Sequence, residues 1–122
     1  RDLAIVSFGN GTYLSTKAAQ QLESDGISTR VIDLRWISPL PEEALRAALE
    51  GVKNVLIVDE TRHSGGVAEA LMAFCAENLD VPFARETAED SFIATGPAYA
   101  VTMPSDVGIA SVAKSLVKGG AK

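Results

Sequence analysis

The sequence predicts an α/β domain in which helices cover both faces of a mainly parallel sheet. Short apolar runs alternate with segments whose apolar residues recur every three or four positions. The apolar runs begin at regular intervals, near residues 3, 28 and 54. Runs of this length suit strands that are buried on both faces, and regular strand–helix alternation is typical of the crossover units that join parallel strands.

The first unit consists of a strand over residues 3–8 and a helix over residues 12–25. Thr12 is the expected N-cap, because its hydroxyl can accept a hydrogen bond from a free backbone N–H of the first turn. Gly26 follows the last turn, where a left-handed conformation ends many helices. A second strand over residues 28–34 is rich in β-branched side chains, which favour strands.

Two prolines interrupt the next segment, residues 36–41, so it cannot form a regular element. A short helix over residues 42–50 follows, and then a third strand over residues 54–59. We expect a polar turn after that strand and a helix over residues 66–78. Cys75 lies on the apolar stripe of this helix and is expected to be a buried thiol.

The fourth strand is expected over residues 81–85, at a sheet edge because Pro82 cannot donate a ladder hydrogen bond. Residues 86–103 show a weaker pattern and are interpreted as an excursion that covers the core or meets a partner. A last helix opens at Pro104 and Ser105 and runs to about residue 117. The pair Gly119-Gly120 ends that helix.

Size and charge restrict the classes of function. The chain has 122 residues, which fits one domain, and a net charge of −5, which argues against nucleic acid as a partner. No apolar stretch is long enough to cross a membrane. A single cysteine cannot form an internal disulfide, so we expect a reducing compartment, the cytoplasm or the mitochondrial matrix in a eukaryote. The start at Arg1, directly before a strand, suggests that residues 1–122 are a single domain cut from a longer chain.

Ionisable side chains gather beside a glycine pair after the third strand. Open parallel sheets place ligand-facing and partner-facing groups at the carboxyl ends of their strands. The candidates here are Glu60, Arg62, His63, Gly65 and Gly66. Gly65-Gly66 could let backbone amides approach an anion, although a tight turn with close helix packing is the favoured interpretation. His63 either bonds locally or serves a site shared with another domain.

A second group of candidates follows the second strand. We expect Asp33 and Arg35 to form an ion pair, while Trp36 either covers the core or anchors a partner. Gly9-Asn10-Gly11 begins like a dinucleotide-binding loop, but Leu14 stands where the third glycine belongs, so nucleotide binding has little support. The single histidine excludes multi-histidine zinc sites, and no activated serine or cysteine is present. We therefore assign no catalytic residue and no metal ligand.

Several motifs together resemble the C-terminal domain of the transketolase superfamily over essentially the whole chain. The most similar group is the beta subunit, or beta-like half, of thiamine-diphosphate-dependent 2-oxo acid dehydrogenases. The resemblance rests on Asp33-Leu34-Arg35, Ile37-Ser38-Pro39-Leu40, Asp59-Glu60, Gly65-Gly66-Val67-Ala68-Glu69, Gly9-Asn10-Gly11 and Pro104-Ser105-Asp106-Val107. Two features depart from the family pattern: Ala68 replaces a frequent glycine, and residues 90–97 replace a proline-rich stretch.

The resemblance implies a three-layer α/β/α fold with a five-stranded, mostly parallel sheet that includes one antiparallel strand. It also implies that thiamine diphosphate and Mg²⁺ bind other domains of the parent enzyme, since the family's Gly-Asp-Gly and Asn motif is missing here. The glutamate that activates thiamine likewise belongs to another domain.

Under this reading the domain is not catalytic alone and supports assembly with other domains or subunits, as a dimer or heterotetramer. The acyltransferase core is a further candidate partner. Two alternatives stay open: a transketolase or deoxyxylulose-phosphate synthase domain, and a free-standing α/β module that binds an anion or a partner.

Overall fold

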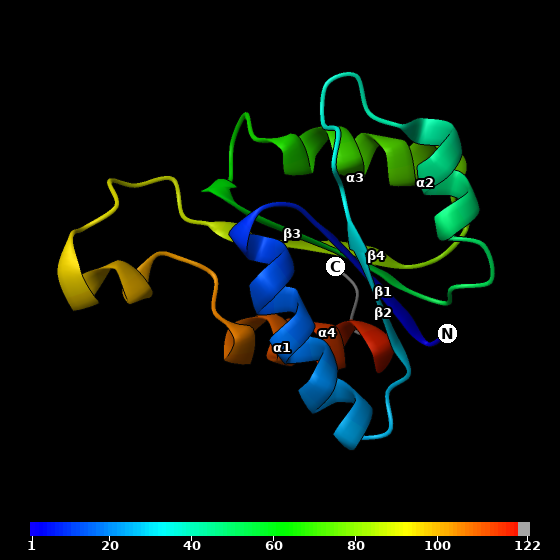
Figure 1. The fold of residues 1–122 in the computed structure, drawn as a ribbon, viewed down its shortest axis with the longest axis horizontal. Coiled ribbons are helices and arrows are strands. Elements are labelled where there is room, and N and C mark those ends of the chain that lie inside the picture. The colour runs from blue at the N-terminus through cyan, green and yellow to red at the C-terminus, as the bar shows by residue number, and fades with distance from the viewer. Residues whose placement is uncertain (120–122) are drawn as a thin grey trace.

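The computed structural model describes residues 1–119 and has a three-layer α/β/α architecture (Figure 1). Its sheet contains four strands in the order β2-β1-β3-β4, and every described pair is parallel. The strands are β1 (Leu3–Ser7), β2 (Thr29–Asp33), β3 (Val55–Arg62) and β4 (Phe83–Ala88). The helices are α1 (Asn10–Ser24), α2 (Glu42–Ala48), α3 (Val67–Asn78), the 3₁₀ turn η1 (Gly96–Val101) and α4 (Asp106–Val117).

Two apolar cores lie on opposite faces of the sheet. Helices α2 and α3 cover one face, where Leu45, Leu71 and Phe74 pack against Val55 and Ile57. Helices α1 and α4 cover the other face, as Figure 1 shows, and their core residues are Ala18, Leu22, Ile109, Ala113 and Leu116. Alternating residues of β1 and β3 point into each core, which is why those strands read as unbroken apolar runs.

The predicted fold class is confirmed, with a difference in strand number. The resemblance implied a fifth, antiparallel strand, and residues 1–119 contain none. The remaining apolar pieces after β4 are short and are separated by Gly96 and Pro97. They form a loop and η1 instead, because proline lacks the N–H of a sheet ladder.

The boundaries of most elements differ from the predicted ones by a few residues, and the differences in α1, β3 and β4 affect the interpretation. Helix α1 begins at Asn10 with Gly9 as its N-cap, so Thr12 lies inside the first turn. Strand β3 continues to Arg62 through an irregular register, so the residues expected in a turn belong to the strand. Strand β4 begins at Phe83 and extends to Ala88, later than predicted, and it does lie at an edge of the sheet.

Several local predictions are confirmed. Cys75 is 2% exposed, and burial raises the pKa of its thiol to about 11. Ser105 caps α4, because its side chain accepts a hydrogen bond from the backbone N–H of Gly108. Gly26 and Gly119 have positive φ just past the ends of α1 and α4. Gly120, the other half of the terminal glycine pair, lies outside the described residues. Within residues 1–119, no helix is long and apolar enough to cross a bilayer.

Candidate interaction surface at the carboxyl rim

All predicted site residues lie at one edge of the sheet. The four strands are parallel, so their carboxyl ends meet there, together with the loops that follow. We call this edge the carboxyl rim. Asp33 ends β2, Glu60 and Arg62 belong to the last part of β3, and the remaining candidates lie in the loops after these strands: Arg35, Trp36, His63, Gly65 and Gly66.

The buried residue of the rim is Asp59, which is 1% exposed. One carboxylate oxygen accepts hydrogen bonds from the backbone N–H and the hydroxyl of Thr61, each at 2.8 Å. The other oxygen accepts from the backbone N–H of Ala68, at 2.9 Å, in the first turn of α3. A helix N-terminus attracts negative charge, and here the chain supplies that charge itself.

This arrangement explains the glycine pair. Gly65 has φ +73°, a conformation that side chains disfavour. A Cβ on Gly66 would lie 2.5 Å from the Thr61 hydroxyl and 3.1 Å from the Asp59 carboxylate. The glycines therefore allow a tight turn and close packing. The interpretation of Gly65-Gly66 as an anion site has no support, because the Asp59 carboxylate occupies the end of α3.

Glu60 is half-buried and lies near the carboxyl end of β3. It accepts a hydrogen bond from the Asn10 amide at 3.0 Å, which ties the β3 end to the first turn of α1. Gly11 in that turn packs directly on the Ser7 hydroxyl, which donates to the Val58 carbonyl at 2.8 Å. The Gly-Asn-Gly loop thus serves close helix–sheet packing.

The predicted ion pair of Asp33 and Arg35 is confirmed, with a distance of 2.8 Å between guanidinium and carboxylate. The other oxygen of Asp33 accepts from the Thr12 hydroxyl at 3.1 Å. Trp36 follows this pair and is 63% exposed, while its neighbour Ile37 is 41% exposed. Of the two interpretations of Trp36, the core cover is wrong for this chain. Trp36 is free to contact a partner.

His63 bonds locally, as the favoured interpretation predicted. Its Nε2 accepts from the guanidinium of Arg85 at 2.8 Å, because a guanidinium has no acceptor. The proton of the neutral ring therefore lies on Nδ1, which donates to the Thr87 hydroxyl at 3.0 Å. Thr87 in turn donates to the Ala88 carbonyl. The imidazole thus links the turn before α3 to strand β4.

A second link joins the same turn to the segment after β4. Ser64 donates to the Asp90 carboxylate through both its backbone N–H, at 2.8 Å, and its hydroxyl. These hydrogen bonds lower the pKa of Asp90 below its usual range. Within residues 1–119, no hydrogen bond or ion pair joins the Asp33–Arg35–Thr12 group to the His63–Arg85–Thr87 group, so these two polar networks of the rim are separate.

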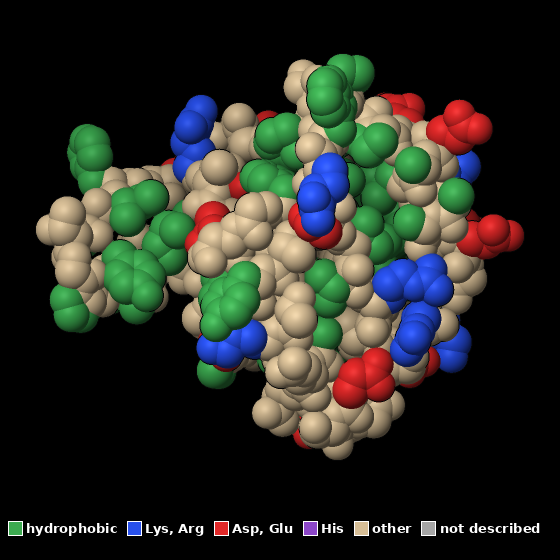
Figure 2. All heavy atoms as spheres, in the orientation of Figure 1, with side chains coloured by type: hydrophobic (Ala, Val, Ile, Leu, Met, Phe, Trp, Pro, Cys, Tyr) green, Lys and Arg blue, Asp and Glu red, His purple; other side chains and the backbone are tan. Residues whose placement is uncertain are grey.

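The segment interpreted from the sequence as an excursion, residues 86–103, divides into the end of β4 and a projecting part, residues 89–103, which we call the arm. Its large apolar side chains belong to neither core, so the interpretation that it covers the core is wrong for them, while contact with a partner stays a prediction. In Figure 1 the arm extends away from the sheet, in yellow and orange, and Figure 2 shows apolar side chains gathered on it. Its large exposed apolar residues are Phe92, Ile93, Tyr99 and Val101. The available signal was a stretch without any charge from Ser91 to Ser105.

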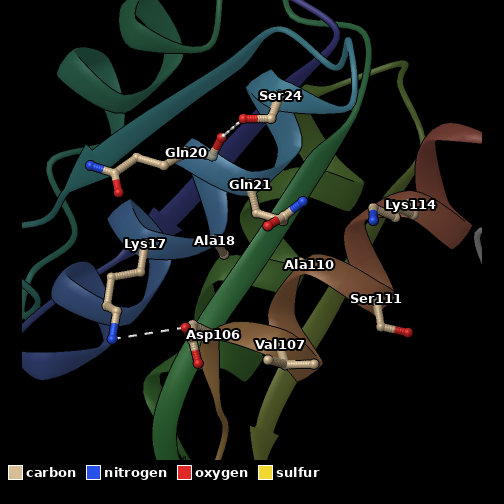
Figure 3. A pocket seen from close by; sticks show the side chains of 10 residues that line it. All are labelled: Lys17, Ala18, Gln20, Gln21, Ser24, Asp106, Val107, Ala110, Ser111 and Lys114. Atoms are coloured by element: carbon tan, nitrogen blue, oxygen red, sulfur yellow. Dashed lines mark hydrogen bonds and ion pairs between the residues drawn. The ribbon is translucent and has the colours of Figure 1, made fainter.

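A separate hollow of about 580 Å³ lies between α1 and α4 (Figure 3). Its lining mixes polar and apolar surface, and its cations are already paired. Lys17 lies 3.9 Å from Asp106, as the dashed line in Figure 3 marks, and Lys114 lies 2.6 Å from Asp25. An anionic ligand would have to break these ion pairs, so we assign no site there.

The donor groups of residues 1–119 do not suit thiamine diphosphate and Mg²⁺. No set of three carboxylate, imidazole or thiol groups in this range is placed to hold a metal ion. The N-terminus of α3, where a diphosphate could bind, is occupied by the Asp59 carboxylate. We therefore derive no reaction step through this cofactor on this chain.

The family described as "Transketolase, C-terminal domain" matches residues 1–109. This chain belongs to that family. The resemblance predicted from the sequence motifs is thereby confirmed. The matched range contains all four strands and every rim residue described above.

Curated relatives of this transketolase C-terminal domain include proteins described as "Pyruvate dehydrogenase E1 component subunit beta". The relative from Bacillus subtilis is 31% identical and the one from Staphylococcus epidermidis is 33% identical. Each match covers 96% of this chain and 37% of the relative. The chain thus spans little more than a third of the length of these proteins.

Two solved structures show the same fold. A split gene transketolase, described as an inactive beta4 tetramer, superposes with a TM-score of 0.84 at 22% identity. The match covers 96% of this chain and 39% of that one. A 2-oxoglutarate:ferredoxin oxidoreductase from Magnetococcus marinus gives a TM-score of 0.69 at 15% identity, covering 95% of this chain and 18% of the other.

Proposed function

We propose that this domain is the C-terminal part of the decarboxylating component of a thiamine-diphosphate-dependent 2-oxo acid dehydrogenase. The parent enzyme would decarboxylate a 2-oxo acid on thiamine and pass the acyl group to a lipoyl carrier. The observation that carries the proposal is the similarity to pyruvate dehydrogenase beta subunits, which extends over 96% of the chain. Residues 1–122 would form a single domain of that longer protein.

In this proposal the domain binds neighbouring domains or subunits and performs no chemistry alone. Thiamine diphosphate and Mg²⁺ would bind elsewhere in the parent, which would be a dimer or heterotetramer and would dock on an acyltransferase core. The proposed contact residues are the rim side chains Asp33, Arg35, Trp36, Glu60, Arg62 and His63, with Gly65 and Gly66 shaping the turn. Trp36 supports this role, because interfaces favour exposed aromatic anchors.

The decisive assay uses the full-length parent with its companion subunit. We expect release of CO₂ from pyruvate or a branched-chain 2-oxo acid that depends on thiamine diphosphate and Mg²⁺. Transfer of a two-carbon unit between sugar phosphates, without 2-oxo acid decarboxylation, would overturn the dehydrogenase assignment and favour a transketolase parent. Binding of thiamine diphosphate by residues 1–122 alone would contradict the assembly role.

Assembly is tested separately with the double variant Arg62→Ala/His63→Ala in the full parent. We expect weaker association of subunits or slower turnover. The matched control is Lys53→Ala, which removes a cation from the opposite edge of the sheet, where Lys53 pairs with Asp2 at 3.1 Å. Unchanged association and turnover in the double variant would show that Arg62 and His63 do not contribute to the interface.

A further inference from the structure

The arm is an ordered loop whose two ends are fixed to the body of the domain by contacts on either side. The backbone N–H of Glu89 donates to the Thr102 carbonyl at 3.0 Å, so the two ends of the arm meet. On one side Asp90 binds Ser64, and on the other Pro104 is buried where the chain enters α4. A loop of this kind, with adjacent ends, presents its tip in a defined place.

The tip of the arm is apolar and has no cover within this chain. Phe92 is 101% exposed, Val101 79%, Ile93 57% and Tyr99 52%. These side chains contribute to neither core. A contiguous apolar patch of this kind marks an interaction site on a soluble protein.

One cation lies beside this patch without an anionic partner. Arg62, Asp90, Ser91 and Phe92 line the same hollow, but both carboxylate oxygens of Asp90 accept hydrogen bonds from Ser64. The neighbouring rim cations are engaged, since Arg35 pairs with Asp33 and Arg85 donates to the His63 carbonyl. The guanidinium of Arg62 makes no hydrogen bond or ion pair with residues 1–119. It lies beside Gly65, where an added Cβ would be 3.5 Å away from it. Its natural complement is a carboxylate on another molecule.

We propose that the arm docks into an apolar groove of a different subunit or domain of the parent, with a carboxylate at the groove edge that receives Arg62. The arm projects from the body and is convex, so it fits a concave receiver (Figures 1 and 2). Insertion into another face of a second copy is a heterologous contact, which tends to propagate rather than close.

This inference rests on the proposed assembly role but not on the identity of the reaction. If the parent proves to be a transketolase, the decarboxylation assay fails while the arm can still be tested in that parent. Conversely, the parent could prove to be a dehydrogenase whose subunit association is unchanged by substitutions in the arm. That result would leave the proposed function intact and overturn this inference.

The test uses the purified full-length parent and its companion subunit, with association measured by mass photometry over a dilution series. Val101→Ser and Val107→Ser form a matched pair, because the two side chains are 79% and 76% exposed and only Val101 belongs to the arm. We expect Val101→Ser to weaken association about tenfold and Phe92→Ser about thirtyfold. Val107→Ser should leave it unchanged. Equal effects at positions 101 and 107, or none at either, would overturn the proposal.

The carboxylate is tested through Arg62→Gln and Arg62→Lys. We expect Arg62→Gln to weaken association about tenfold and to reduce its dependence on salt concentration, because exposed ion pairs are screened by salt. Arg62→Lys should retain part of the affinity. An unchanged salt dependence in Arg62→Gln would contradict the pairing.

The occupant is identified with a benzophenone amino acid at position 92 of the assembled parent. A cross-link to the companion subunit or to another domain, mapped by mass spectrometry, supports the proposal. A cross-link between two copies of residues 1–122, or no cross-link at all, overturns it.

Discussion

The carboxylate of Asp59 lies 2.9 Å from the backbone nitrogen of Ala68, so the acid that ends the buried part of β3 also caps α3. This contact decides how the rim can function. The end of the helix cannot accept an outside anion while Asp59 occupies it. This leaves the exposed side chains of Arg62 and Trp36 as the groups through which the proposed contacts with other protein parts would be made.

Replacing Asp59 with Ala should destabilise the domain by about 2–3 kcal/mol, because the buried N–H group of Ala68 and the part-buried N–H group of Thr61 lose their carboxylate acceptor. Urea denaturation of the wild type and the variant measures this difference. Glu60→Ala is the control, because Glu60 accepts from the exposed Asn10 amide and should contribute less than about 1 kcal/mol. Equal losses in the two variants would refute the capping role.

Gly66→Ala should cost about 1–3 kcal/mol through overpacking, because the new methyl group meets the Thr61 hydroxyl and the Arg62 carbonyl. Gly66→Ala should cost less in a Thr61→Ala background, because Thr61→Ala removes the nearest of the three atoms that crowd the new methyl group, the others being the Arg62 carbonyl and the Asp59 carboxylate. Thermal or urea unfolding of the single and double variants tests this coupling. Strictly additive effects would show that the contact at Thr61 is unimportant.

Glu86→Gln should stabilise the domain at pH 7. Burial raises the pKa of Glu86, so the folded state binds its proton more tightly than the unfolded state. The cost of the charged form is absent below the ordinary value of 4.5 and grows as pH rises through the higher folded value. Unfolding midpoints at pH 4 and pH 7 should differ less in Glu86→Gln than in the wild type. A loss of stability at pH 7 would mean that the carboxylate makes a favourable contact.

Asp25→Asn should have the opposite pH signature. A hydrogen bond from Lys114 is the main reason that the pKa of Asp25 is lowered, so this acid stabilises the fold above its ordinary value of 3.8. The contribution disappears as pH falls below 3.8 through the lower folded value. The variant should therefore be less stable than the wild type at pH 7 and similar at pH 2. Asp80→Asn, which removes an exposed carboxylate from the loop before β4, is the control.

Cys75 should resist alkylation while the domain is folded. Burial between α3 and the sheet raises the pKa of the Cys75 thiol to about 11, and the thiolate is the reactive form. At pH 8, iodoacetamide should label the folded chain slowly and the urea-unfolded chain rapidly, as followed by mass spectrometry. Equally rapid labelling in both states would show that the α3 core opens readily.

The sequence by itself determined the layers of this fold and the location of its rim. Apolar runs such as 55–58 can only be strands covered on both faces, and strand–helix alternation requires parallel crossovers. That order carries Asp33, Glu60 and His63 to one edge of the sheet, as predicted. The family motifs were also readable, because they depend on residue identity and spacing.

Only the tertiary structure decided what each rim residue contacts. The capping of α3 by Asp59 and the link from His63 to Arg85 join residues 9 and 22 positions apart, and no local pattern encodes such pairs. The arm shows the same limit: its lack of charge was visible, but whether Phe92 is buried or exposed depends on how the whole chain packs. Periodicity reports which elements form, whereas side-chain partners follow from where those elements meet.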